Sequence, residues 1–252
     1  SSFFKKFQNC LIDIGGQNCP PCAGSASPSL KQLKNSNPDE FVYISYVAAQ
    51  YQSIRTAQAG NVNPINRASH LATDSSNSAP RAYFGDCTHG SSTCYKSAVG
   101  GSNAYDNMFS GTGGEDNNMH STVNSYNMVI TQTQSGSDAT ITVEATYTGG
   151  GTSDVRVLAA VTEDVCNSYP YYDGSKPGHC WKKWLVNSAN TGPISMTLSS
   201  SPTTYSWTVP VNTVNGGMSN MLSVAWLQDD WTSGGTRHSV LSATDSSMVP
   251  PV

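Results

Sequence analysis

Stretches that alternate apolar and polar residues recur through the second half of the chain, and they limit its fold most tightly. About eight such stretches follow residue 125, and turn residues separate them at spacings typical of antiparallel sheets. The expected strands are residues 126–132, 139–147, 155–162, 181–186, 194–198, 204–211, 221–227 and 239–243. This pattern predicts an antiparallel β-sandwich, with no helix longer than about two turns after residue 125.

The first hundred residues mix strand and helix signals instead. The expected strands are residues 10–14, 41–47 and 81–84, and the last of them follows Pro80. Helical spacing of leucines over residues 20–34 predicts a helix kinked at Pro28, and residues 50–72 are weakly helical. The order strand, helix, strand, helix, proline, strand is typical of an α/β domain.

The composition changes near residue 100, where a segment rich in Gly, Ser and Asn begins. Such a segment is typical of a linker or a long surface loop. We therefore expect an α/β domain over residues 1–105, a polar linker over 106–121 and a β-sandwich domain over 122–252.

Charged residues make up only 12% of the chain, which has seven cysteines and a net charge of −4. A surface of Ser, Thr, Asn and Gly with many cysteines favours an exported protein in an oxidising compartment: secreted, periplasmic or at the cell surface or outer membrane. No basic run suggests nucleic acid as a partner. No apolar stretch approaches the ~20 residues that span a bilayer. Residues 1–7 are too short for a signal peptide and carry no initiator Met, so we expect a processed chain.

The motif Cys19-Pro20-Pro21-Cys22 is the clearest chemical signal in the chain. A zinc site of four thiolates needs a second such pair, which the sequence lacks. The motif lies where a buried strand runs into a helix, and the N–H groups at a helix N-terminus stabilise a thiolate on Cys19 and lower its pKa. Cys22, one turn later, is placed to resolve a mixed disulfide.

Residues 11–22, Leu-Ile-Asp-Ile-Gly-Gly-Gln-Asn-Cys-Pro-Pro-Cys, resemble the active-site segment of thioredoxin-fold proteins. The resemblance implies that Asp13, six positions before Cys19, assists proton transfer from Cys22. It also implies that Pro80 is the cis-proline that faces the disulfide. The sequence departs from the family at Asn18, where thioredoxins usually have Trp, and at Pro28, one position later than the usual proline.

Residues 157–164, 224–230 and 239–243 resemble the C-terminal part of the Omp28-related proteins. These are exported or outer-membrane bacterial proteins with a thioredoxin-like region followed by a β-sandwich. The resemblance implies the same order of domains here. It predicts the fold of the chain more firmly than it predicts a chemical reaction.

These features predict thiol-disulfide exchange outside the cytoplasm, with Cys19 attacking, Cys22 resolving, Asp13 moving the proton and Pro80 shaping the groove. The reaction needs no cofactor, and the partners would be protein thiols or disulfides. Because Pro20 and Pro21 lack N–H groups, we expect a reduction potential of the cysteine pair nearer −270 mV than −120 mV.

The alternative is a cell-surface structural, adhesive or filament-forming protein that uses the thioredoxin-like domain as a scaffold beside neighbouring surface proteins. In that case the cysteine pair is inert, Asp13 is a satisfied polar group and Pro80 an ordinary loop proline.

The other cysteines favour local disulfides, Cys87 with Cys94 and Cys166 with Cys180. Cys10 is left over, either as a buried apolar residue or as an intermolecular bridge. Weaker candidates are two metal sites, one of them for calcium, and an aromatic binding surface. The metal candidates are Glu115, Asp116, Met119 and His120, and Glu163-Asp164 with Asp229-Asp230. The aromatic candidates are Tyr169, Tyr171, Tyr172, Trp181 and Trp184, which more often pack in a core.

Overall fold

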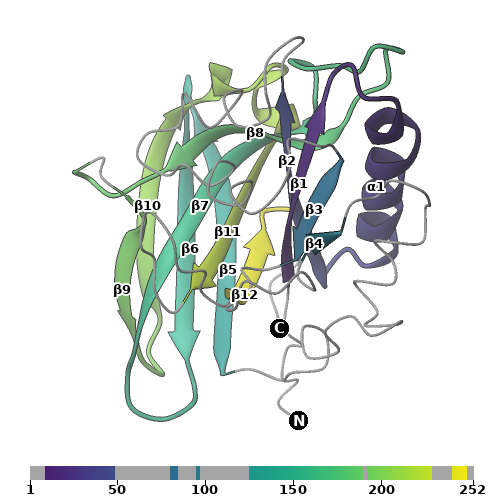
Figure 1. The fold of residues 1–252 in the computed structure, drawn as a ribbon. Helices are drawn as coiled ribbons and strands as arrows, with labels where there is room; N and C mark the ends of the chain where they lie inside the picture. Colours follow the sequence, from purple (N-terminus) through teal and green to yellow (C-terminus); the bar gives the residue numbers. More distant parts are fainter. Residues whose placement is uncertain are drawn as a thin grey trace.

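The computed structural model describes residues 9–48, 80–84, 95–96, 125–189, 192–228 and 240–248, and these residues are mostly β-strand (Figure 1). The strands are β1 (Asn9–Gly16), β2 (Phe41–Ala48), β3 (Arg81–Phe84), β4 (Tyr95–Lys96), β5 (Tyr126–Ser135), β6 (Asp138–Tyr147), β7 (Ser153–Val165), β8 (Gly178–Leu185), β9 (Ile194–Leu198), β10 (Thr203–Pro210), β11 (Met221–Gln228) and β12 (Val240–Asp245). The helical elements are the π-helical turn η1 (Cys22–Ala26), the α-helix α1 (Ser27–Ser36) and the 3-10 turns η4 (Val211–Thr213) and η5 (Gly217–Asn220).

All eight strands expected after residue 125 are present, as β5 to β12. In the part of this region that the structure describes, the helical elements are the short turns η4 and η5. The two strands β1 and β2 also match the expected runs, and β3 begins directly after Pro80. The weakly helical residues 50–72 and the predicted linker over 106–121 lie outside the described residues.

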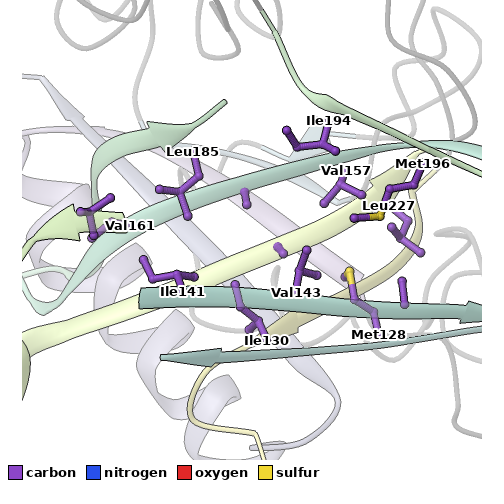
Figure 2. Close-up of a cluster of buried hydrophobic side chains, with 14 of the residues drawn as sticks. Met128, Ile130, Ile141, Val143, Val157, Val161, Leu185, Ile194, Met196 and Leu227 are labelled. Atoms are coloured by element: carbon purple, nitrogen blue, oxygen red, sulfur yellow. The ribbon is translucent and has the colours of Figure 1, made fainter. Parts of the chain in front are cut away.

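The main core lies between a three-stranded sheet, β10-β6-β5, and the β7, β9 and β11 part of a nine-stranded sheet. Alternate residues of β6 are buried, as the period of a strand requires when one face meets the core. Figure 2 shows Ile141 and Val143 of β6 in the same apolar cluster as Val157 of β7 and Leu227 of β11. This packing of two sheets confirms the sheet-rich architecture expected for the second half of the chain.

The nine-stranded sheet contains strands from both predicted domains. Its order is β12-β11-β7-β8-β2-β1-β3-β4, with β9 beside β7. The two halves meet where β2 runs parallel to β8, with Ser45 opposite Cys180. Hydrogen bonds thus link the N-terminal strands to the sandwich, and the division at residues 106–121 remains a prediction.

The N-terminal unit is a parallel pair, β1 and β2, connected by a helical segment over residues 20–36 (Figure 1). Leu30 and Leu33 of α1 are buried, which accounts for the helical spacing of the leucines. Directly before Pro28, where we expected a kink, the structure has a π-turn, in which the N–H of Ser27 bonds the carbonyl of Cys22. Because Pro28 has no N–H to donate, the wider turn before it lets the helix continue without a break.

A buried ion pair joins α1 to the C-terminal strand. Lys34 Nζ lies 2.6 Å from Asp245 Oδ2, and it also donates to the carbonyls of Pro38 at 2.7 Å and Phe41 at 3.0 Å. The carboxylate of Asp245 is fully buried. In the part of the chain that the structure describes, no helix is both long and apolar enough to cross a membrane.

Candidate disulfide site

Cys19 caps the helix that follows β1. The chain is helical from Pro20, and the carbonyl of Cys19 accepts a hydrogen bond from the N–H of Ala23 at 3.1 Å. The sulfur of Cys19 accepts a hydrogen bond from the N–H of Cys22 at 3.2 Å. A serine or aspartate oxygen makes the same bond at a helix N-cap. Pro20 and Pro21 have no backbone N–H group. The N–H of Cys22 is therefore the first donor in this helix that can bond the sulfur of Cys19.

The two cysteines of this pair differ in exposure. Cys19 and Cys22 form a disulfide with their Cα atoms 5.2 Å apart. Cys22 is completely buried, whereas Cys19 is half-buried. Tyr171, from the loop between β7 and β8, packs on Cys22 and Ala23, and Cys19 lies at the edge of this cluster. Cys19 is therefore the more exposed cysteine of the pair.

Gln17 holds the segment before Cys19 against the loop that carries Tyr171. Its side-chain Nε2 donates to the carbonyl of Pro170 at 3.0 Å. Its carbonyl accepts a hydrogen bond from the N–H of Tyr172 at 3.0 Å. Two bonds on either side of Tyr171 thus fix the position of this ring over Cys22.

The β7–β8 loop, defined here as residues 166–177, is held at its base and at its tip. Its base is closed by the Cys166–Cys180 disulfide, whose cysteines are both fully buried. At its tip the N–H of Tyr171 bonds the carbonyl of Ser175 at 2.8 Å, and Gly174 adopts a left-handed conformation with φ of 81°. A further bond runs from Lys31 Nζ of α1 to the carbonyl of Lys176.

A small acidic turn completes the tip of this loop. Asp173 Oδ1 accepts hydrogen bonds from the N–H and the hydroxyl of Ser175, at 2.9 Å and 2.6 Å. These bonds hold the pKa of the exposed Asp173 carboxyl below its usual value. These bonds within the tip add to the contacts that Gln17 and Lys31 make with the same loop.

Asp13 and Pro80 lie on the strands next to the disulfide. In β1, Asp13 pairs with Ser45 of β2 and with Ala82 of β3. Pro80 is buried and directly precedes β3, whose first residue pairs with Ile14 near the end of β1. The backbone thus brings Pro80 to the end of β1 from which Cys19 emerges. The proton-transfer role of Asp13 and the groove-shaping role of Pro80 stay predictions.

The fold is similar to that of HBP35 of Porphyromonas gingivalis. That solved structure aligns with a TM-score of 0.67 at 12% sequence identity, over 96% of this chain and 76% of that chain. At this identity the likeness shows the sheet-rich fold alone. A beta-glucosidase from Kluyveromyces marxianus aligns at 14% identity over 50% of this chain and 14% of its own, with a TM-score of 0.25. No family model matches the chain, and no curated protein sequence matches it.

Glu163, a candidate calcium ligand, is engaged by its own chain. Its buried carboxylate accepts hydrogen bonds from the N–H groups of Asn167, Ser168 and Asn215 and from the Ser168 hydroxyl, at 2.7 to 3.1 Å. Lys182 Nζ lies 3.5 Å away. Burial raises the pKa of this carboxyl, but the bonds from Asn215 and Ser168 and the charge of Lys182 outweigh it, so the pKa is lowered.

Asp164 faces His179, whose Nε2 lies 3.5 Å from Asp164 Oδ1. The hydrogen bond from His179 is the main reason that the pKa of Asp164 is lowered. Among the described residues no three His, Cys, Asp or Glu side chains gather as a metal site would require. Asp229 and Asp230, and the second candidate set, Glu115, Asp116, Met119 and His120, lie outside those residues. Calcium binding remains a prediction.

Most of the candidate aromatic surface is packed inside the molecule. Trp181 and Trp184 of β8 cluster with Tyr46 of β2, with ring centroids 6.2 to 6.3 Å apart. Tyr169 packs beside the Cys166–Cys180 disulfide. Tyr171 covers Cys22, so Tyr172 is the candidate aromatic that stays exposed.

The predictions for Cys87 with Cys94 and for Cys10 concern residues that the structure describes only in part or not at all. Cys87 and Cys94 lie outside the described residues, so their pairing stays a prediction. The backbone of Cys10 lies in β1 opposite Val42 of β2. This position suits either alternative for Cys10, a buried apolar residue or an intermolecular bridge.

Sequence reasoning missed Gln17 as a residue of the site, and it missed that Tyr171 contacts the disulfide. The one available signal was the group of three tyrosines in a loop that two cysteines close. Nothing local indicates that this loop meets a segment some 150 residues earlier, because the contact depends on the pairing of β2 with β8.

Proposed function

We propose that this protein exchanges thiols and disulfides with polypeptides outside the cytoplasm, through Cys19 and Cys22. The observation that carries the proposal is the difference between the two sulfurs. Cys19 is only half-buried, and its sulfur accepts a hydrogen bond from the N–H of Cys22, which favours the thiolate form once the pair is reduced. Cys22 is buried beneath Tyr171, as a resolving cysteine that acts only on its neighbour would be.

The exchange proceeds in two balanced steps. In the reduced protein the Cys19 thiolate attacks one sulfur of a substrate disulfide, forming a mixed disulfide and releasing a substrate thiolate. The Cys22 thiolate then attacks the Cys19 sulfur, forming the disulfide of this structure and releasing the second substrate thiolate. Two electrons pass from the protein to the substrate, and the reverse sequence oxidises a substrate dithiol. Asp13 would take the proton of Cys22, and Pro80 would border the substrate groove.

The strand arrangement supports a thioredoxin-like assignment for residues 1–105. β1 and β2 are parallel with a helix between them, and the cysteine pair lies where β1 gives way to that helix. The antiparallel β3 begins after Pro80, as the sequence resemblance implies. With the sandwich of residues 122–252, this arrangement supports placement among the Omp28-related proteins.

Two disulfides, Cys19–Cys22 and Cys166–Cys180, support an extracytoplasmic location. Disulfides persist in oxidising compartments and are rare in the cytosol. The small share of charged residues, 12%, agrees with export.

A redox titration of the native protein tests this function. The oxidised protein is equilibrated with dithiothreitol or glutathione buffers, alkylated and mapped by mass spectrometry. We expect Cys19–Cys22 to reduce with a potential around −270 mV, while the buried Cys166–Cys180 disulfide stays oxidised as an internal control. The protein should also reduce insulin, and Cys19→Ser should abolish this activity. Failure to reduce Cys19–Cys22 in the folded protein would contradict the proposal.

The same titration separates exchange from the alternative of an inert structural or adhesive scaffold. A scaffold has no need of an accessible sulfur, and it would retain Cys19–Cys22 until it unfolds. The half-exposure of Cys19 supports exchange over this alternative.

A further inference from the structure

We infer that the β7–β8 loop selects the substrate, and that Tyr172 contacts an apolar side chain near the cysteine of an incoming polypeptide. The inference rests on the proposed exchange at Cys19, and it names the substrate class for that site. It assigns to the sandwich half of the chain a part in recognition.

Tyr172 is unusual in its exposure. The residue is 60% exposed, and among the described residues Val165, at 44%, is the other exposed large apolar residue. A tyrosine offers a large contact area at a small cost in conformational entropy, which makes it a common contact residue at interfaces. Such a side chain beside a reactive sulfur is placed to bind what approaches that sulfur.

The backbone places Tyr172 beside the cysteine pair. Its N–H donates to the carbonyl of Gln17, two residues before Cys19. Its neighbour Tyr171 points inward to Cys22, whereas Tyr172 is exposed to solvent. A polypeptide whose cysteine reaches Cys19 would therefore pass Tyr172 within a few residues.

The loop holds Tyr172 before any substrate arrives. The Cys166–Cys180 disulfide closes its base, the Tyr171–Ser175 hydrogen bond closes its tip, and Gln17 bonds both sides of Tyr171. A contact residue that is already ordered loses little freedom on binding, so more of the contact energy appears as affinity.

The other exposed residues around Cys19 define the chemistry of the partner. Asn18 and Pro20 are exposed and uncharged, and an exposed charge next to Tyr172 is the Asp173 carboxylate, which disfavours an acidic substrate. The site should thus prefer aromatic or aliphatic side chains next to the substrate cysteine. Small thiols such as dithiothreitol can react at Cys19 without reaching Tyr172.

Competing peptides test the inference. Two synthetic dithiol peptides of equal length are used, one with Phe and one with Ser beside each cysteine. A peptide thiolate attacks Cys19, displacing the Cys22 thiolate, which takes a proton from the buffer. The second peptide thiolate then attacks the peptide sulfur and releases Cys19. The peptide leaves as a disulfide, and two electrons have passed to the protein.

We expect the Phe peptide to reduce the native protein roughly three- to tenfold faster than the Ser peptide, the effect of one aromatic contact. Tyr172→Ser should bring the two rates together while the dithiothreitol rate stays unchanged. Val165→Ser, the matched control, should keep the preference. Equal rates in the native protein, or a preference that survives Tyr172→Ser, would overturn the inference with exchange intact. A native protein that dithiothreitol cannot reduce would instead overturn the proposed function.

Discussion

Cys19 and Cys22 are three residues apart, yet their surroundings predict different reactivity. In Cys22→Ser the remaining Cys19 thiol is half-exposed at the helix N-cap, and it should alkylate readily at pH 8. In Cys19→Ser the remaining thiol lies under Tyr171, and alkylation should be at least about tenfold slower because burial limits access. Rates of iodoacetamide labelling by mass spectrometry measure the ratio. Equal rates would show that Tyr171 does not shield Cys22.

Glu163 should make stability depend on acidic pH. Its pKa is lower in the folded protein than in the unfolded chain, where it is about 4.3, so the unfolded state takes up the proton first as the pH falls. The stability from this carboxylate is therefore present above about pH 4.3 and is lost as the pH falls through the folded pKa. Urea unfolding from pH 7 to pH 3 should show the loss, and the slope should flatten in Glu163→Gln. An unchanged slope in this variant would assign the acid sensitivity to other groups.

At the scale of elements, the start of β8 depends on Gly178. A Cβ atom there would run into the hydroxyl of Tyr43, a fully buried side chain of β2 that stacks on His179 with ring centroids 4.0 Å apart. Gly178→Ala should therefore lower the free energy of unfolding by about 1–3 kcal/mol, as overpacking does. Gly24→Ala is the control, since its Cβ would meet open space within the helical segment. A Gly178→Ala protein as stable as this control would mean that Tyr43 yields easily.

The elements themselves were largely predictable, whereas their partners were not. Strands such as β6 and β10 bury one face, and their alternation is visible in the sequence. The junction of β2 with β8 leaves no such trace, because nothing in either segment marks the distant strand with which it pairs. The burial of Lys34 was equally hard to predict. A lysine on an amphipathic helix is expected to be exposed, and only the tertiary structure shows that Asp245 lies beside it. The cysteine motif was evident, and the loop that covers it required the tertiary structure.

At the scale of the whole molecule, the Lys34–Asp245 pair should join the stability of the first helix to that of the last strand. Asp245→Asn leaves the buried Lys34 ammonium without its counter-charge, and removal of one partner of a buried pair costs roughly 3–5 kcal/mol. Lys34→Met with Asp245→Leu should recover part of this loss, because no charge then remains unpaired. Unfolding followed by far-ultraviolet dichroism and by tryptophan fluorescence checks both, and the two probes should give one transition. Two separate transitions would show that the halves unfold independently.

The contact between Tyr171 and Cys22 also sets an order of events during biosynthesis. A ribosome delivers Cys22 well before Tyr171, so the emerging N-terminal half carries a cysteine pair that nothing yet covers. Both thiols are then accessible, and Tyr171 covers Cys22 only when the second half of the chain has folded. Pulse alkylation during refolding of the reduced protein should label Cys22 early and lose that label as β7 and β8 assemble. A loop from the second half of the chain thus gives a sulfur near the start of the chain its final reactivity.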